Sequence, residues 1–228
     1  MAEFIFMLTH NDRTVDHALD ALHVALKVGV RHVGFKDVGS TPERQVELVS
    51  TAREAGVTTY LEVVAETRDA ELAAVSAGIT AGVDWILGGK AATDVVDMLR
   101  GRNIRYAPFC GRTVGHPSVL EGTVDEIASD AATLTAIDGV DGVDLLAYRH
   151  RTADIGSLIS STVSRSAGPV IVAGSVTSAE QVRTIADAGA WGFTIGGAVF
   201  SNELDARPGL ESQLTTALQY ASDTQQDY

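Results

Sequence analysis

The stretch Val170–Phe200, VIVAGSVTSAEQVRTIADAGAWGFTIGGAVF, contains two short apolar runs that each end in small residues. The first run ends at Gly174 and Ser175, and the second ends at Gly196 and Gly197. A helical segment follows each run directly. Apolar runs too short for a helix are typical of buried parallel strands, so this stretch predicts two successive strand–turn–helix units.

The same unit repeats along the chain. Short apolar runs alternate with segments of helical period, spaced about 25 residues apart, which is a typical length for βα units. A helix end, a glycine and a strand recur as KVGVRHVGF, EAGVTTYLEV, TAGVDWILGG and DAGAWGFTIGG. The expected strands are Phe4–Thr9, His32–Lys36, Thr58–Val64, Asp84–Leu87, Arg105–Phe109, Val143–Tyr148, Pro169–Ala173 and Gly192–Ile195.

Eight βα units in 228 residues predict a single (β/α)8 barrel domain spanning residues 1–228. An open doubly wound sheet is the alternative. Eight units are many for such a sheet, and no Pro/Gly/Ser-rich tract divides the chain. The long connection CGRTVGHPSVLEGTVDE, after the fifth strand, is polar and rich in turn residues, which indicates an active-site loop.

Two of the helical segments have clear sequence signals. PERQVELVSTAREAG places Val46, Val49 and Ala52 on one apolar stripe. SAEQVRTIADAG offers Ser178 as the N-cap, with Gln181 three residues later, which is the pattern of a capping box.

Composition argues against several classes of function. The net charge of −13 disfavours nucleic acid or an anionic membrane as a partner, because both need a basic surface. No apolar run is long enough to span a membrane, and the N-terminus lacks the basic flank of a signal peptide. Cys110 is the single cysteine, which fits a reducing compartment. We therefore expect a cytoplasmic protein.

The two glycine turns predict an anion site. In a closed barrel the loops after strands seven and eight lie side by side, and glycines there let backbone N–H groups approach an anion. Gly174 and Ser175 would supply one set of donors. Gly196 and Gly197 would supply the second, at the start of the short helix GAVFSN. Glycines that merely form tight turns are the alternative, but two such turns on consecutive units favour a phosphate.

Lys36 and Glu62 are the candidate catalytic pair. Alternation along the second strand puts Lys36 on the face of Gly34, opposite Val33 and Phe35, so the lysine points into the barrel. Glu62 is costly to bury unless it is paired, and Lys36 is a ready partner. A structural ion pair is the alternative. A catalytic pair could remove a proton next to a carbonyl and stabilise the enolate, or the lysine could form a Schiff base.

Four further polar residues near strand ends are candidates for smaller roles. His116, in the long loop, is a candidate catalytic acid or base. Arg112, Arg149 and Lys90 are cations that suit a second anionic group on the substrate.

No cofactor is expected, and the alternative is a divalent metal such as Mg²⁺ held by Asp37 and Glu62 together with His10. No tight ligand spacing enforces that alternative. The expected partner is a small phosphorylated metabolite, and a homodimer is the oligomeric state common among such barrels.

The closing stretch resembles the phosphate-binding TIM barrels, a group that includes ribulose-phosphate-binding enzymes, histidine and tryptophan biosynthetic isomerases, and N-acylglucosamine-6-phosphate 2-epimerase. The shared pattern is an aliphatic strand, a Gly-x-hydroxyl turn, a helix, AGA, a strand and GGA. VGFKDVG resembles the end of strand two in the epimerase, where a lysine occupies the place of Lys36. The epimerase's glutamate at the end of strand seven is replaced here by AGS. The resemblance implies a barrel fold and a phosphosugar-like substrate.

The sequence therefore predicts an enzyme that acts on a small phosphorylated carbonyl or sugar compound. The leading hypothesis is an isomerase or epimerase in which Glu62 is the base and Lys36 stabilises the enolate. An aldolase or decarboxylase-type lyase that uses Lys36 is the second hypothesis. A regulatory phosphometabolite-binding barrel is the third; it would keep the glycine turns but need no Lys36–Glu62 pair.

Overall fold

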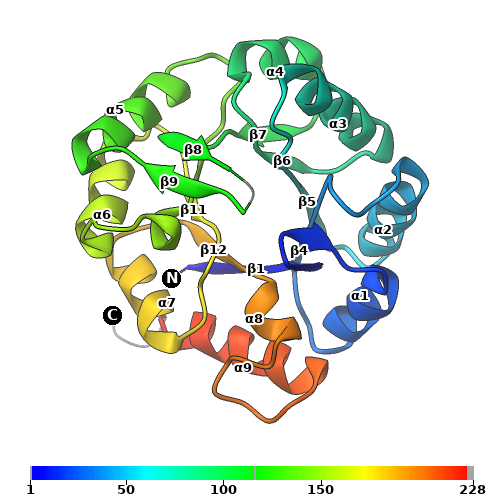
Figure 1. Ribbon diagram of the computed structural model, residues 1–228. Helices are drawn as coiled ribbons and strands as arrows, with labels where there is room; N and C mark the ends of the chain where they lie inside the picture. Colours follow the sequence, from blue (N-terminus) through cyan, green and yellow to red (C-terminus); the bar gives the residue numbers. More distant parts are fainter. Residues whose placement is uncertain (1, 116, 225–228) are drawn as a thin grey trace.

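The computed structural model describes residues 2–115 and 117–224. In this part of the chain, eight parallel strands follow the sheet order β10-β11-β12-β1-β4-β5-β6-β7. A parallel bridge between Phe109 and Asp144 joins the two edges and closes the barrel. Figure 1 looks along the barrel and shows the helices as an outer ring. The strands are β1 Glu3–Met7, β4 His32–Lys36, β5 Thr58–Val63, β6 Trp85–Gly88, β7 Arg105–Ala107, β10 Val143–Leu145, β11 Val170–Val172 and β12 Gly192–Ile195.

The predicted single (β/α)8 barrel is confirmed, because a helix follows every barrel strand before the next one begins. The last strand is followed first by a one-turn helix, α8 (Gly197–Phe200), as GAVFSN predicted. The helices of the outer ring are α1 Ala18–Lys27, α2 Pro42–Glu54, α3 Arg68–Ala81, α4 Ala92–Leu99, α5 Val124–Thr135, α6 Ile155–Arg165, α7 Ala179–Asp187 and α9 Leu210–Asp223.

The sixth strand is shorter than the sequence indicates. The prediction ran to Tyr148, but β10 ends at Leu145 and a 3-10 helix, η1 (Ala147–Arg149), follows. The hydroxyl of Tyr148 donates a hydrogen bond to the carbonyl of Gln181 on α7, so the ring packs between helices. The turn places Arg149 just beyond the C-terminal end of β10.

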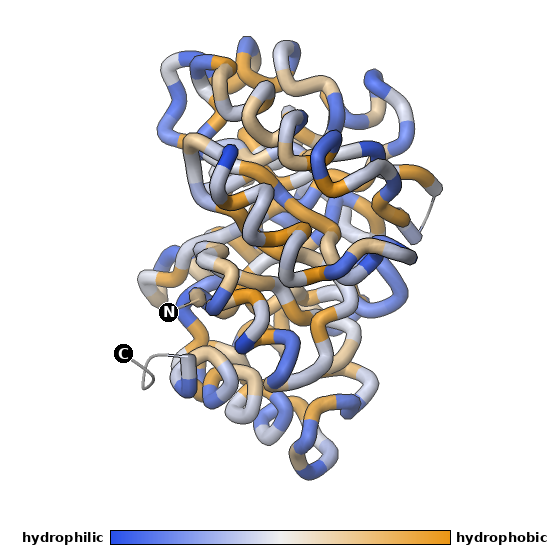
Figure 2. The backbone as a smooth tube through the Cα atoms, turned by 90° about the vertical axis from the view of Figure 1, so that its left-hand side faces the viewer, coloured by the Kyte–Doolittle hydropathy of each residue, from blue (hydrophilic) through white to orange (hydrophobic). Residues whose placement is uncertain are grey.

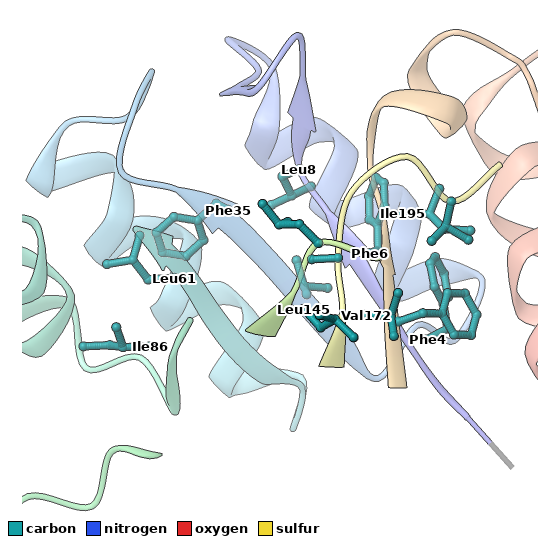
Figure 3. Close-up of a cluster of buried hydrophobic side chains, with 14 of the residues drawn as sticks. Phe4, Phe6, Leu8, Phe35, Leu61, Ile86, Leu145, Val172 and Ile195 are labelled. Atoms are coloured by element: carbon teal, nitrogen blue, oxygen red, sulfur yellow. The ribbon is translucent and has the colours of Figure 1, made fainter. Parts of the chain in front are cut away.

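Two apolar layers hold the barrel together. The larger one lies between the strands and the helices, and Figure 3 shows Phe4, Phe6, Phe35 and other strand residues that form it. In Figure 2, hydrophobic segments gather toward the middle of the molecule and hydrophilic ones mark many of its outer turns. The smaller layer fills the barrel interior with side chains that alternate with those of the first. Its buried members are Ile5, Met7, Tyr60, Trp85, Leu87, Ala107 and Ile171.

The predicted apolar stripe of α2 is partly wrong. Val49 and Ala52 are buried, but Val46 is 42% exposed and Gln45 is buried in its place. A helix turns 100° per residue, so positions 45, 49 and 52 lie on one face of α2. Position 46 lies at the edge of that face, about 100° from position 45. The N-cap of α7 is confirmed, because the Ser178 side chain accepts a hydrogen bond from the amide of Gln181.

Two short β-hairpins lie at the same end of the barrel as the strand C-termini. The first pairs β2 (Thr9–His10) with β3 (Arg13–Thr14), directly after β1. The second pairs β8 (Arg112–Val114) with β9 (Val119–Glu121) and is formed by the long connection after β7, as Figure 1 shows. Among the described residues, no helix has the length and apolar character needed to cross a membrane.

Candidate active site

A cavity of about 500 Å³ opens at the C-terminal ends of the barrel strands. Its wall includes both glycine turns, the Lys36–Glu62 pair and part of the β8–β9 hairpin. This is the face on which (β/α)8 enzymes carry their catalytic residues. The long connection therefore lies where an active-site loop was expected, since Pro117, Ser118 and Val119 all line the cavity.

Lys36 and Glu62 meet in the cavity because their strands are paired in register. Their Cα atoms are partners across β4 and β5, so both side chains point to the same face. The Lys36 Nζ lies 3.6 Å from Glu62 Oε1, and the two side chains are only 4% and 5% exposed. Val33 and Phe35 belong to the layer under the helices, as the alternation predicted. The predicted pair is thus formed in the structure, and its catalytic role is a proposal that we take up below.

Asp12 is a central member of this site that the sequence analysis did not single out. It stands at the tip of the β2–β3 hairpin, where its Oδ1 accepts hydrogen bonds from Lys36 Nζ and Arg149 Nη2, both at 2.7 Å. Its Oδ2 accepts from Arg149 Nη1 at 2.8 Å. Burial acts to raise the pKa of Asp12, but hydrogen bonds and charge from Arg149 and Lys36 outweigh it and hold the pKa well below its usual range.

The sequence signal for Asp12 was weak. An Asn-Asp dipeptide after a strand indicates a turn, and Asn11 and Asp12 do adopt left-handed backbone angles, with φ of 50° and 57°. A turn prediction does not say that the chain folds back over its own strand end. Hydrogen bonds between the Thr14 hydroxyl and the backbone of Lys36, at 2.8 and 2.9 Å, fix that arrangement in the folded protein.

The two glycine turns line the same cavity, as predicted. Gly174 and Ser175 both have left-handed backbones, with φ of 77° and 60°. Gly197 is the first residue of α8, where amide groups have no partner within the helix. In the described part of the chain, the amides of Ser175, Gly197 and Ala198 donate no hydrogen bond to another protein group. These donors are free to bind an anion.

Gly196 and Gly197 serve different purposes in the second turn. A Cβ at Gly196 would come within 2.6 Å of the Thr9 hydroxyl and 2.8 Å of the Met7 carbonyl, so close packing requires a glycine there. A Cβ at Gly197 would meet nothing within 4 Å, and its φ is not in the positive region. Packing therefore does not explain the glycine at 197, whereas space for a ligand does.

Asp144 is the second residue that sequence reasoning missed. It is fully buried, and neither of its carboxyl oxygens has a hydrogen-bond partner in the described structure. Its neighbours Val143 and Leu145 pack under the helices, so its side chain faces the barrel interior. Burial, with a further contribution from the charge of Glu62, raises the pKa of Asp144 well above its ordinary value. Hydropathy patterning shows that Asp144 is a polar residue within a strand. It does not show that the carboxyl group lacks a hydrogen-bond partner.

Arg149 reaches the cavity as predicted, but two other expected cations do not line it. The Arg112 side chain is 71% exposed and forms an ion pair with Glu121 across the β8–β9 hairpin. Lys90 lines a separate cavity of about 220 Å³ and donates a hydrogen bond to the carbonyl of Thr113 at 2.6 Å. Each of these two side chains binds a neighbouring group, and neither lines the larger cavity. His116, the predicted acid or base, lies outside the described residues.

Of the three alternative metal ligands, His10 and Glu62 line the cavity and Asp37 does not. Among the described residues, no three His, Cys, Asp or Glu side chains are arranged to hold one metal ion, so Asp37, Glu62 and His10 are not gathered into a ligand set. Asp37 instead accepts a hydrogen bond from the amide of Val64 at 3.0 Å, which fixes the loop after β5.

Comparison with known proteins rests on structure. No protein-family model matches the sequence, and no curated protein sequence matches it. The structure of native KDPGal superposes with a TM-score of 0.70 at 16% identity, over 98% of this chain and 96% of that one. Orotidine 5'-phosphate decarboxylase from Pyrococcus horikoshii OT3 gives 0.67 at 13% identity, over 96% and 99% of the chains.

N-acetylmannosamine-6-phosphate 2-epimerase from Clostridium perfringens gives a TM-score of 0.62 at 15% identity, over 86% of each chain. At such identities the likeness establishes the fold, and reactions differ widely among barrels that share it. The (β/α)8 barrel that the resemblance implies is thus confirmed as the fold.

Proposed function

We propose that this protein is an enzyme that isomerises or epimerises a small phosphorylated carbonyl or sugar compound. One observation carries the proposal: the Lys36–Glu62 pair shares a single cavity with the two glycine turns. A purely structural ion pair would not need to line a cavity, and a purely regulatory phosphate site would not need a buried base. The fold itself is shared with enzymes of several reaction classes.

The phosphate of the substrate would bind the free amides of Ser175, Gly197 and Ala198. Backbone N–H groups in such turns suit a dianion because they donate without bringing a side chain into the space. The Arg149 Nε adds a charged donor, since the guanidinium packs against Gly174 while its Nη atoms hold Asp12. The phosphate thereby fixes one end of the substrate and leaves the other end facing Lys36 and Glu62.

At that other end Glu62 removes the proton next to the carbonyl. The Lys36 ammonium, 3.6 Å from the Glu62 carboxylate, donates to the oxygen on which the negative charge develops. Return of the proton to the adjacent carbon, with the hydroxyl proton moving to the former carbonyl oxygen, would complete an isomerisation. Delivery of a proton to the opposite face of the same carbon, by an acid on that side, would complete an epimerisation. Both outcomes use the same first step.

A lyase that uses Lys36 as a Schiff-base nucleophile is less well supported. Such a lysine must lose its proton to attack a carbonyl. Here the Nζ already donates to Asp12 at 2.7 Å and lies 3.6 Å from Glu62, so attack on a carbonyl would have to break these buried ion pairs.

The test is proton exchange in deuterated water with a panel of ketose, aldose and N-acyl-hexosamine phosphates, followed by NMR. Wild-type protein should exchange the C–H next to the carbonyl of its substrate. Glu62→Gln should slow that exchange by about 10²–10⁴-fold, the usual contribution of a general base. Glu66→Gln is the matched control, because Glu66 follows the same strand but lines the smaller cavity.

Borohydride reduction in the presence of the same compounds distinguishes the lyase hypothesis from the isomerase hypothesis. Covalent labelling of Lys36, seen by mass spectrometry, would overturn the isomerase mechanism in favour of a Schiff base. If wild-type protein bound phosphate but, like Glu62→Gln, exchanged no C–H proton of any compound, the result would favour the regulatory barrel.

A further inference from the structure

Asp12 is held rigidly in its place at the mouth of the barrel. The β2–β3 hairpin that carries it is tied to the end of β4, because the Thr14 hydroxyl bonds to both the amide and the carbonyl of Lys36. The Thr14 amide also donates to the carbonyl of Val38 at 2.9 Å. Asp12 is therefore a fixed component of the cavity wall, and its side chain is only 8% exposed.

The contacts of Asp12 are those that a bound carboxylate would make. One of its oxygens accepts from Lys36 and from Arg149, and the other accepts from the second terminal nitrogen of Arg149. A two-oxygen acceptor on the guanidinium fork is the preferred geometry for carboxylate recognition by arginine. The chain's own carboxylate thus occupies the place where these two cations would receive an acidic group of a ligand.

The charges at this end of the cavity are already balanced. Lys36 and Arg149 supply two positive charges, and Asp12 and Glu62 supply two negative ones. Asp144 lies nearby without a hydrogen-bond partner among the described residues, and burial favours its neutral form. Among the described residues, an added carboxylate would find both cations already paired with carboxylates and would face Asp12 and Glu62, so like-charge repulsion and desolvation would oppose it.

We infer that Asp12 is a specificity-determining residue that excludes carboxylates from the reactive end of the cavity and selects phosphorylated substrates whose other end carries only carbonyl and hydroxyl groups. The inference rests on the proposed function, since it assumes that the phosphate lies at the glycine turns. It narrows the substrate class to neutral-headed sugar phosphates and disfavours phosphorylated sugar acids.

Two probes of matched length test this inference. Erythritol 4-phosphate and 4-phosphoerythronate differ in having a hydroxymethyl group or a carboxylate at the end remote from the phosphate. Wild-type protein should bind the alcohol at least about tenfold more tightly by calorimetry, a difference of about 1.4 kcal/mol. Asp12→Asn keeps the size of the side chain but frees a positive charge, so it should reduce the preference at least about tenfold or reverse it.

Asp16→Asn is the control, because it removes one negative charge from an exposed residue of the same connection. It should leave the preference as in wild type. Equal or tighter binding of the acid by wild-type protein would overturn the inference without any variant, even if Asp12→Asn failed to fold. An unchanged preference in folded Asp12→Asn would overturn it as well. If neither probe bound wild-type protein, the phosphate site itself, and with it the proposed function, would be wrong.

Discussion

The guanidinium of Arg149 packs against Gly174, so closely that a Cβ at residue 174 would collide with the arginine Nε. Arg149 comes from η1 and Gly174 from the turn after β11. Their contact joins the charged cluster around Asp12 to the turn proposed to hold phosphate. The two halves of the site are therefore mechanically linked through one arginine.

Replacing Gly174 by alanine should weaken phosphate binding about 10–100-fold, because Arg149 loses the position from which it makes a charged hydrogen bond. The left-handed backbone, with φ of 77°, adds a stability cost of about 1–2 kcal/mol. Gly56→Ala is the matched control, since Gly56 has φ of 71° but open space around its Cβ position. Equal loss of phosphate affinity in both variants would show that backbone strain, and not Arg149, is responsible.

Replacing Gly197 by alanine should separate stability from function. Alanine is the better helix former by about 0.5–1 kcal/mol and would meet no protein atom at this position, so the free energy of unfolding should hold or rise. Its methyl group would project into the space needed by the anion, and the affinity for inorganic phosphate should fall. Unchanged phosphate affinity, measured by calorimetry, would argue that the anion binds elsewhere.

Replacing Lys36 by methionine should destabilise the protein by about 3–5 kcal/mol, because Glu62 is left buried without its cation. The double variant with Glu62→Gln should recover part of this loss, which urea denaturation of both variants would measure. Lys27→Met provides the comparison, since its ion pair with Glu211 is exposed and is worth less than about 1 kcal/mol. If the second substitution restored no stability, the two residues would not be coupled.

Asp144 should make the protein less stable as the pH rises. Its pKa is higher in the folded than in the unfolded state, so the folded state binds more protons and loses stability as pH increases from the ordinary aspartate range through the folded pKa. Asp144→Asn removes this loss. The melting temperature of the variant minus that of wild type should thus increase between pH 5 and pH 8. A difference that is constant across that range would mean that Asp144 is already ionised in the folded state throughout it.

Much of the barrel follows from the sequence because it depends on local rules. His32–Lys36 and Gly192–Ile195 were expected as strands and are β4 and β12 with the same bounds. Short apolar runs, glycines at helix ends and the period of two within a strand all act over a few residues. These same rules put Lys36 and Glu62 on the inner face and the glycine turns after strands seven and eight.

The tertiary structure decided which of the candidate charges belong to the site. Lys90 and Arg112 stand near strand ends as Arg149 does, yet each binds a local partner, whereas the turn at η1 carries Arg149 over the barrel. Asp12 is bound by an arginine 137 residues away in the sequence, and Asp144 is fully buried in the folded barrel. Pairing and burial of charges depend on distances in three dimensions and on the exclusion of water, and neither is encoded in the spacing of residues along the chain.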